Sequence, residues 1–140
     1  MALPTHLQLQ IVSADRSLVN EQVDEVEIPG ADGYFGVLPG HTPLLALLGA
    51  GELWYRQGQD KHYLMIAFGF AEVQPERVTI LAQIAEHPHE VDVARAQAAL
   101  KRVQERLAAP TPDMDFERAR IAMMKSLIRL QVASQARSRA

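Results

Sequence analysis

The hydrophobic period of the chain changes in the segment from Glu86 to Glu90. Before it, apolar residues recur at every second position among many glycines and prolines, which is typical of short strands. After it, they recur every three or four positions, as in amphipathic helices. The charge also changes sign, because residues 1–90 hold 4 Lys and Arg against 12 Asp and Glu, and residues 91–140 hold 10 against 5. The sequence therefore predicts an acidic β-rich domain over residues 1–87 and a basic helical domain over residues 88–140.

Strands are expected throughout the first part. Leu7, Leu9 and Ile11 alternate with polar residues, as in a half-buried strand. Two hairpins are predicted from apolar runs joined by turn residues, one over residues 53–67 and one over residues 68–82. Many short strands at close intervals without an intervening helix indicate an antiparallel sandwich or barrel.

Two helices are expected in the second part. The first has an apolar stripe at Val93, Ala96, Leu100, Val103 and Leu107, and the second has one at Phe116, Ala119, Met123, Leu127 and Leu130. Between them, Thr111 is predicted as the N-cap of the second helix, with Pro112 at its first position. A short turn containing proline favours an antiparallel helical hairpin. The fold class is thus mainly β plus α, a sandwich followed by a hairpin.

The two predicted helices carry cations at the same spacing. In each helix the second and third cations follow the first by 7 and 11 residues. The cations are Arg95, Arg102 and Arg106 on the first helix and Arg118, Lys125 and Arg129 on the second. Such offsets are close to whole turns, so each helix has a narrow basic ridge. A solvated face would explain one ridge. Two matched ridges also favour an anion site or an acidic docking surface.

Composition narrows the possible functions. The 140 residues suffice for one ordinary domain, and the absence of cysteine leaves no disulfide, thiol nucleophile or thiolate metal site. No secretory signal and no apolar stretch of about 20 residues is found, so membrane association is expected to run through a partner. The overall charge of −3 disfavours nucleic acid as the main ligand.

The sequence has none of the common catalytic and metal-binding motifs. The glycines between Gly30 and Gly36 lack the Lys-Ser/Thr of a phosphate-binding loop, and neither a Gly-x-Ser-x-Gly nor a His-Glu-x-x-His motif occurs. His87 and His89 lie beside acidic residues, which is more typical of a solvated hinge than of a zinc site. We therefore expect no catalysis by the chain itself and no metal.

Two stretches of the sequence are distinctive, namely Gly36 to Leu45, preceded by Gly33, and Val91 to Ala96. Both resemble motifs of the ε subunit of bacterial F-type ATP synthases. The resemblance covers essentially the whole chain. It implies a flattened antiparallel β-sandwich of about ten strands that joins the γ subunit and the membrane ring of c subunits, as part of the rotor that couples proton flow to ATP synthesis. It also implies a helical hairpin that extends towards the catalytic αβ hexamer and inhibits ATP hydrolysis, in a complex on the cytoplasmic face of the inner membrane.

The resemblance also implies roles for particular residues. The segment matching the γ and c-ring contact comprises Gly33, Tyr34, Phe35, Gly36, Val37, Leu38, Pro39, Gly40 and His41. Tyr34 stands where relatives can carry an acidic residue, so aromatic packing is expected there. The positions that bind ATP in some members are Asp92, Arg95, Arg102, Lys125 and Arg129. Lys125 replaces an arginine and loses its bidentate fork. ATP is thus a candidate regulatory ligand, and no cofactor is required.

Alternatives remain open at this level. Asp92 and Arg95 could form only a local pair near a helix start. The hairpin could belong to a free-standing ATP-sensing module instead of a rotor subunit, while a small β-sandwich enzyme is disfavoured by the missing catalytic residues. Ile121, Met124 and Ile128 give the second helix another apolar flank, which could let the hairpin dock in two ways.

Overall fold

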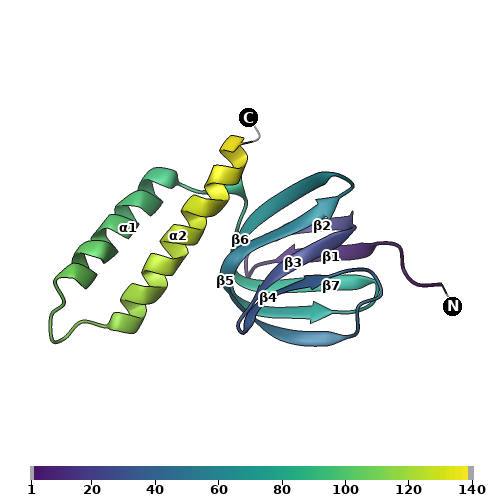
Figure 1. Cartoon of the computed structure of the whole chain (residues 1–140), viewed down its shortest axis with the longest axis horizontal. Coiled ribbons are helices and arrows are strands. Elements are labelled where there is room, and N and C mark those ends of the chain that lie inside the picture. Colours follow the sequence, from purple (N-terminus) through teal and green to yellow (C-terminus); the bar gives the residue numbers. More distant parts are fainter. Residues whose placement is uncertain (1, 139–140) are drawn as a thin grey trace. The chain divides into compact units, whose positions relative to one another are not determined.

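The structure is a computed structural model that describes residues 2–138, with the backbone alone described for residues 136–138. The chain divides into two compact units, one ending at His87 and one starting at Pro88. The first unit is built of strands and the second of helices (Figure 1). The expected combination of a β-sandwich and a helical hairpin is confirmed.

Seven strands form one hydrogen-bonded sheet in the first unit, in the order β2-β1-β7-β6-β5-β3-β4. Their bounds are β1 Leu7–Val12, β2 Ser17–Val23, β3 Glu25–Gly30, β4 Gly33–Val37, β5 Leu44–Gln57, β6 Asp60–Val73 and β7 Arg77–Glu86. Five of the six pairings in the described chain are antiparallel, and β1 pairs with β7 in parallel. The expectation of a wholly antiparallel sandwich was therefore wrong for this one pair.

The sheet has seven strands and not the expected ten, because two of its strands are unusually long. β5 and β6 each have 14 residues and pair along nearly their whole length. The sequence predicted separate strands on either side of residues 67 and 68, yet β6 continues through this boundary and through Gly69. A residue without a side chain permits a sharp bend inside a strand. The two long strands thus turn the single sheet back on itself.

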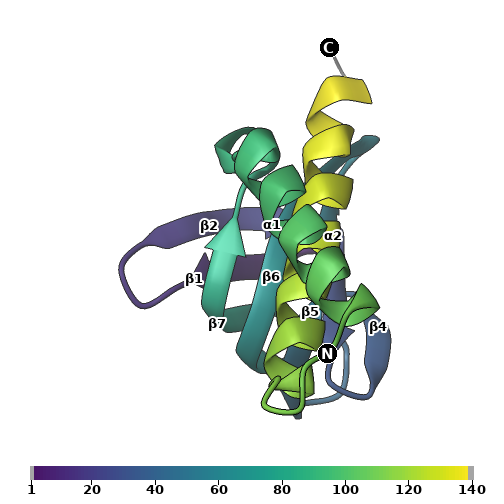
Figure 2. The ribbon, with the colours of Figure 1, turned by 90° about the vertical axis from the view of Figure 1, so that its left-hand side faces the viewer.

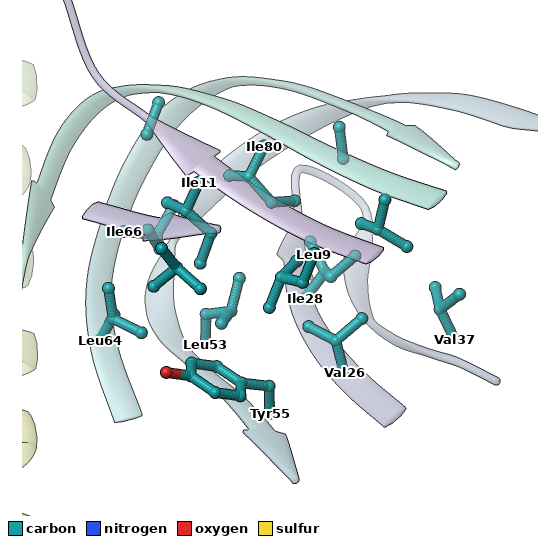
Figure 3. Close-up of a cluster of buried hydrophobic side chains, with 14 of the residues drawn as sticks. Leu9, Ile11, Val26, Ile28, Val37, Leu53, Tyr55, Leu64, Ile66 and Ile80 are labelled. Carbon is teal, nitrogen blue, oxygen red and sulfur yellow. The ribbon is translucent and has the colours of Figure 1, made fainter. Parts of the chain in front are cut away.

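The hydrophobic core fills the space inside this folded sheet. Leu9 and Ile80 approach from β1 and β7, and Leu53 and Leu64 approach from β5 and β6 (Figure 3). All four side chains are fully buried. Burial of a leucine or isoleucine side chain contributes about 1.5–3 kcal/mol, so this unit has a core of its own.

The bend in β6 lies at Phe68 and Gly69. Both have positive φ, 63° at Phe68 and 114° at Gly69. A Cβ atom on Gly69 would overlap the carbonyl oxygen of Leu81 in β7. Glycine is therefore required at position 69 for two reasons, the positive φ of its backbone and the close approach of the neighbouring strand.

The second unit is an antiparallel helical hairpin. After a short 3₁₀ turn, η1 (Pro88–Glu90), come α1 (Val93–Ala108) and α2 (Phe116–Ser138), which lie side by side in Figures 1 and 2. Ala96, Val103 and Ala119 are among its buried residues, as the apolar stripes predicted.

The predicted start of the second helix was wrong. The carboxylate of Asp115 accepts a hydrogen bond from the Arg118 backbone N–H at 3.0 Å, and α2 begins at Phe116. Thr111 lies instead in the preceding turn, where its carbonyl accepts from the Met114 N–H. Aspartate is a stronger N-cap than threonine, which explains the later start.

Substitution of Gly69 by alanine tests the bend. We expect Gly69→Ala to lower the free energy of unfolding by roughly 2–4 kcal/mol, because the new methyl group overlaps a backbone carbonyl at a positive φ. Gly36→Ala is the matched control, since nothing lies within 4 Å of its added Cβ, and its effect should stay within about 0.5 kcal/mol. Urea unfolding of both variants measures the difference. Equal effects would contradict this account of the bend.

Candidate functional site

The segment from Gly33 to His41 presents two kinds of side chain. Val37 lies in the core and Phe35 packs against it, so neither side chain faces solvent freely. Tyr34 and Leu38 alternate with them and are 55% and 57% exposed. This segment therefore contacts the core with one face and offers an aromatic and an aliphatic side chain with the other.

Tyr34 is fixed in place by the backbone of β5. Its hydroxyl oxygen accepts a hydrogen bond from the Glu52 N–H at 3.0 Å. A Cβ atom on Gly51 would overlap this hydroxyl, so only glycine leaves room for it. Tyr34 is thus held in place at its hydroxyl group, while its side chain remains largely exposed.

The Pro39-Gly40 turn is joined to a second turn. The Gly40 N–H donates to the Pro75 carbonyl at 2.7 Å, and the His41 N–H donates to the Leu38 carbonyl at 3.1 Å. Gly40 has a φ of 86°, which favours glycine. These bonds hold the segment in one conformation, and a segment that is already ordered loses less entropy when it binds another molecule.

The sequence did not reveal an apolar surface on the outside of the sheet. Leu47 of β5 is paired with Phe70 of β6, which is paired with Leu81 of β7. Directly paired residues point to the same face, so the three form a row across the strands. They are 61%, 49% and 50% exposed. We call Leu47, Phe70 and Leu81 the outer apolar row.

The outer apolar row continues towards the Gly33–His41 segment. The Leu47 carbonyl accepts from the Ala31 N–H, which lies in the turn between β3 and β4. Leu45, two residues before Leu47 on the same face of β5, is 71% exposed. The signal in the sequence was the unbroken run Leu44 to Leu48, in which the polar residues of a normal solvated face are missing.

In the hairpin, Asp92 acts as a helix cap. Its carboxylate accepts a hydrogen bond from the Arg95 backbone N–H at 3.0 Å, and the Ala96 N–H donates to the Asp92 carbonyl at 3.0 Å. The carboxylate therefore bonds to the Arg95 backbone, and among the described residues it forms no ion pair with the Arg95 guanidinium group, which the sequence had left as an alternative. A negative charge at this end is also favoured by the helix dipole.

Two cavities lie along the groove between α1 and α2. The first, of about 640 Å³, is near the turn and is lined by Arg102, Arg106 and Arg118 among others. The second, of about 550 Å³, is lined by Arg118, Lys125 and Arg129 among others. They adjoin, because Ala99, Asp115, Arg118 and Ala122 line both. The two ridges thus meet in one basic groove.

The groove does not contain the whole predicted nucleotide set. Lys125 and Arg129 line one cavity and Arg102 lines the other, whereas Asp92 and Arg95 line neither.

Arg120 lies outside the two basic ridges and pairs with Glu117, and the hydrogen bond from Arg120 lowers the pKa of the Glu117 carboxyl group. Within residues 2–138 no group of three or more metal-binding side chains is found.

In the part of the chain that the structure describes, neither helix has the length and apolar character of a membrane span.

Comparison with known proteins accounts for both units. Residues 6–88 match the model of the ATP synthase delta/epsilon chain beta-sandwich domain, and residues 89–134 match the long alpha-helix domain of the same chain. The chain belongs to the ATP synthase delta/epsilon family. This confirms the resemblance seen in the sequence.

Relatives match over nearly their full length. An ATP synthase epsilon chain of Koribacter versatilis is 47% identical over 133 residues, covering 95% of this chain and 94% of the relative. One of Solibacter usitatus is 44% identical over 133 residues, covering 95% and 99%. ATP synthase epsilon chain 2 of Syntrophotalea carbinolica is 43% identical over 130 residues, covering 92% and 94%.

Solved structures share the fold. A chain in the mitochondrial ATP synthase of Euglena gracilis (OSCP/F1/c-ring) has a TM-score of 0.71 and 23% identity, covering 99% of this chain and 84% of that chain. A chain in the central stalk/c-ring of the Tetrahymena thermophila mitochondrial enzyme has a TM-score of 0.58 and 11% identity, covering 93% and 95%. The arrangement of strands and helices is therefore retained at low sequence identity.

Substitutions at Asp92 separate its capping role from any role of its charge. We expect Asp92→Ala to destabilise α1 by about 1 kcal/mol, because one N–H of the first turn loses its acceptor. Asp92→Asn should keep nearly full stability, since asparagine caps almost as well. Amide hydrogen exchange of α1 in the intact chain measures both. Equal losses in the two variants would show that the charge matters more than the cap.

Proposed function

We propose that this chain is a non-catalytic rotor subunit of an F-type ATP synthase, in which the sandwich holds the subunit in the central stalk and the hairpin regulates ATP hydrolysis. The observation that carries the proposal is the outer apolar row beside the rigid Gly33–His41 segment, in a chain 43–47% identical to ATP synthase epsilon chains. Exposed apolar side chains in a contiguous row typically mark a protein interface.

The outer apolar row is assigned to the γ subunit. Its three side chains extend from neighbouring strands of a sheet with a full core behind it, so they are held without much loss of entropy on binding. A rotor must transmit torque through such a contact, and a rigid sheet deforms less than a loop. Phe70 at the centre of the row is the natural anchor, because aromatic residues dominate interface energies.

The Gly33–His41 segment is assigned to the ring of c subunits. Tyr34 and Leu38 are its exposed large side chains, and backbone hydrogen bonds hold both ends of the segment. Aromatic packing by Tyr34 replaces the charge that relatives can carry there. Through these partners the chain sits at the cytoplasmic face of the bacterial inner membrane as a peripheral subunit.

The hairpin is assigned an inhibitory role at the αβ hexamer. Residues 91–140 carry ten basic and five acidic side chains, and five of the basic ones line the groove between the helices. A basic surface is attracted to an acidic partner surface, which speeds association and fixes its orientation. The basic ridge is thus suited to an acidic part of the catalytic subunits.

ATP is a candidate regulatory ligand of the same hairpin. Lys125 and Arg129 line one cavity together, and Arg102 lines the adjoining one. Cations around an apolar-floored cavity of this size suit a nucleotide. The alternative, a free-standing ATP sensor, needs the same residues but no affinity for γ, so titration with γ separates the two functions.

Substitution within the outer apolar row tests the γ contact. We expect Phe70→Ser to weaken binding to γ about tenfold or more, because a central aromatic anchor is lost. Phe116→Ser is the matched control, since Phe116 is exposed to a similar extent (57% against 49% for Phe70) but lies at the start of α2. Equilibrium binding to the purified γ subunit measures both. Unchanged affinity in Phe70→Ser would contradict the assignment.

Deletion of residues 88–140 tests whether the two roles separate. The remaining unit keeps its entire core cluster, so it should fold and still join the complex. ATP hydrolysis by the complex should rise, because the basic hairpin can no longer reach the hexamer. Hydrolysis rates of complexes containing the full or the shortened chain measure this. A shortened chain that fails to assemble would argue against separable roles.

A further inference from the structure

The end of β7 leads directly into the helical unit, because β7 ends at Glu86 and that unit begins at Pro88. We propose that Arg16, in the turn between β1 and β2, anchors this end of β7 and so limits the movement of the hairpin. Arg16 acts here through the backbone of β7, which makes it a positioning residue. The anchor follows from contacts within the first unit alone, whereas its effect on ATP hydrolysis rests on the proposed function.

β7 loses one of its two neighbouring strands before it ends. Its pairing with β1 stops where Leu81 lies opposite Val12, but its pairing with β6 continues to Glu86. In the described sheet, residues 82–86 are therefore paired with a strand on one side only. Backbone at such an open edge separates from its sheet more readily than backbone between two strands.

Arg16 takes the place of the missing strand. Its Nη2 donates a hydrogen bond to the Ala85 carbonyl oxygen at 3.2 Å. Ala85 is buried, and a buried carbonyl without a donor is costly. The bond therefore favours the state in which the last residues of β7 stay in the sheet.

The turn that carries Arg16 is itself ordered. The Ser13 N–H donates to the Arg16 carbonyl at 2.9 Å, and the Ser13 hydroxyl donates to the Asp15 carboxylate at 2.8 Å. These bonds close the turn directly after β1. The backbone of Arg16 is therefore held in place, so its bond to Ala85 joins two ordered parts of the sandwich.

The link that follows the anchored strand is short. Only His87 lies between the end of β7 and the first residue of the helical unit. A residue before proline is restricted to extended conformations, so this link is also stiff. Release of the bond to Ala85 would let residues 82–86 leave β6, and each freed residue adds at most roughly 3.3–3.6 Å of reach.

The length of the link determines how many orientations the hairpin can adopt. A long, free link permits many, whereas a short, stiff one permits few. A helical pair that must meet a partner in one orientation binds more tightly when fewer orientations compete. The Arg16 anchor is thus expected to strengthen the inhibition that we assign to the hairpin.

Distances between the two units test the anchor in the full-length chain. The chain has no cysteine, so spin labels can be attached to two introduced ones, Gln59→Cys between β5 and β6 and Gln104→Cys on α1. Both positions are exposed. Double electron–electron resonance should show a broader distance distribution in Arg16→Gln. Amide exchange in residues 82–86 should become about tenfold faster, because a hydrogen bond from a charged donor is lost.

Two further variants serve as controls. Arg16→Lys keeps a charged donor on a long side chain, so it should retain most of the exchange protection. Arg77→Gln removes the same charge from an exposed position at the start of β7, where β1 still pairs with the strand. It should leave the distances and the exchange unchanged. Circular dichroism checks that each variant is folded.

The two measurements decide the anchor. Faster exchange and a broader distance distribution in Arg16→Gln, but not in the two controls, support it. Unchanged behaviour of Arg16→Gln overturns it, as does an equal change in Arg77→Gln. Faster exchange with an unchanged distance distribution also overturns it, because the bond would then stabilise the strand without governing the link.

ATP hydrolysis by the assembled complex tests the regulatory consequence. With Arg16→Gln the rate should rise towards that of complexes whose chain lacks residues 88–140. If the deletion raises the rate and Arg16→Gln does not, the regulatory role of Arg16 is wrong while the proposed function stands. If the deletion leaves the rate unchanged, the proposed function fails, and the distances and the exchange still decide the anchor.

Discussion

The close approach of Gly69 to the Leu81 carbonyl is the contact on which the first unit depends. It occurs where β6 bends, so that one long strand can take part in both halves of the folded sheet. Without the bend, the residues on either side of Gly69 could not face a common core. The same bend sets the positions of Phe70 and Leu81 on the outside. A single backbone constraint therefore determines both the core and the outer apolar row.

Part of the sheet is apolar on both faces. One face forms the core, and the other carries the exposed outer apolar row. Leu53 and Leu64 fill the core, whereas Leu47 and Phe70 are exposed on the outer face. A solvated sheet would place polar residues at the outer positions, since exposed apolar area gains nothing in water. A partner that covered the row would recover the free energy given up there. This is why the exposed row, and not the core, carries the functional interpretation.

The hairpin repeats one design in both helices. Each starts with an aspartate cap, Asp92 or Asp115, followed by cations 3, 10 and 14 residues later. Because the helices run antiparallel, the two ridges approach each other with opposite polarity and meet near the turn, where Arg106 and Arg118 line the same cavity. Local capping thus stabilises each helix, while the pairing of helices creates a concentration of positive charge that neither helix has alone.

The sequence by itself determined the division into a β-rich and a helical part, the two helices and their basic ridges, because these follow from hydrophobic periodicity and charge. Two local motifs were enough to indicate the family. The tertiary structure alone decided that β6 runs as one bent strand through Gly69 and that β1 pairs in parallel with β7. It also decided that Val37 faces the core while Leu47 faces outward. Alternation reveals that a strand has two faces, but which face is buried depends on residues distant in the chain, whose pairing a local pattern does not specify.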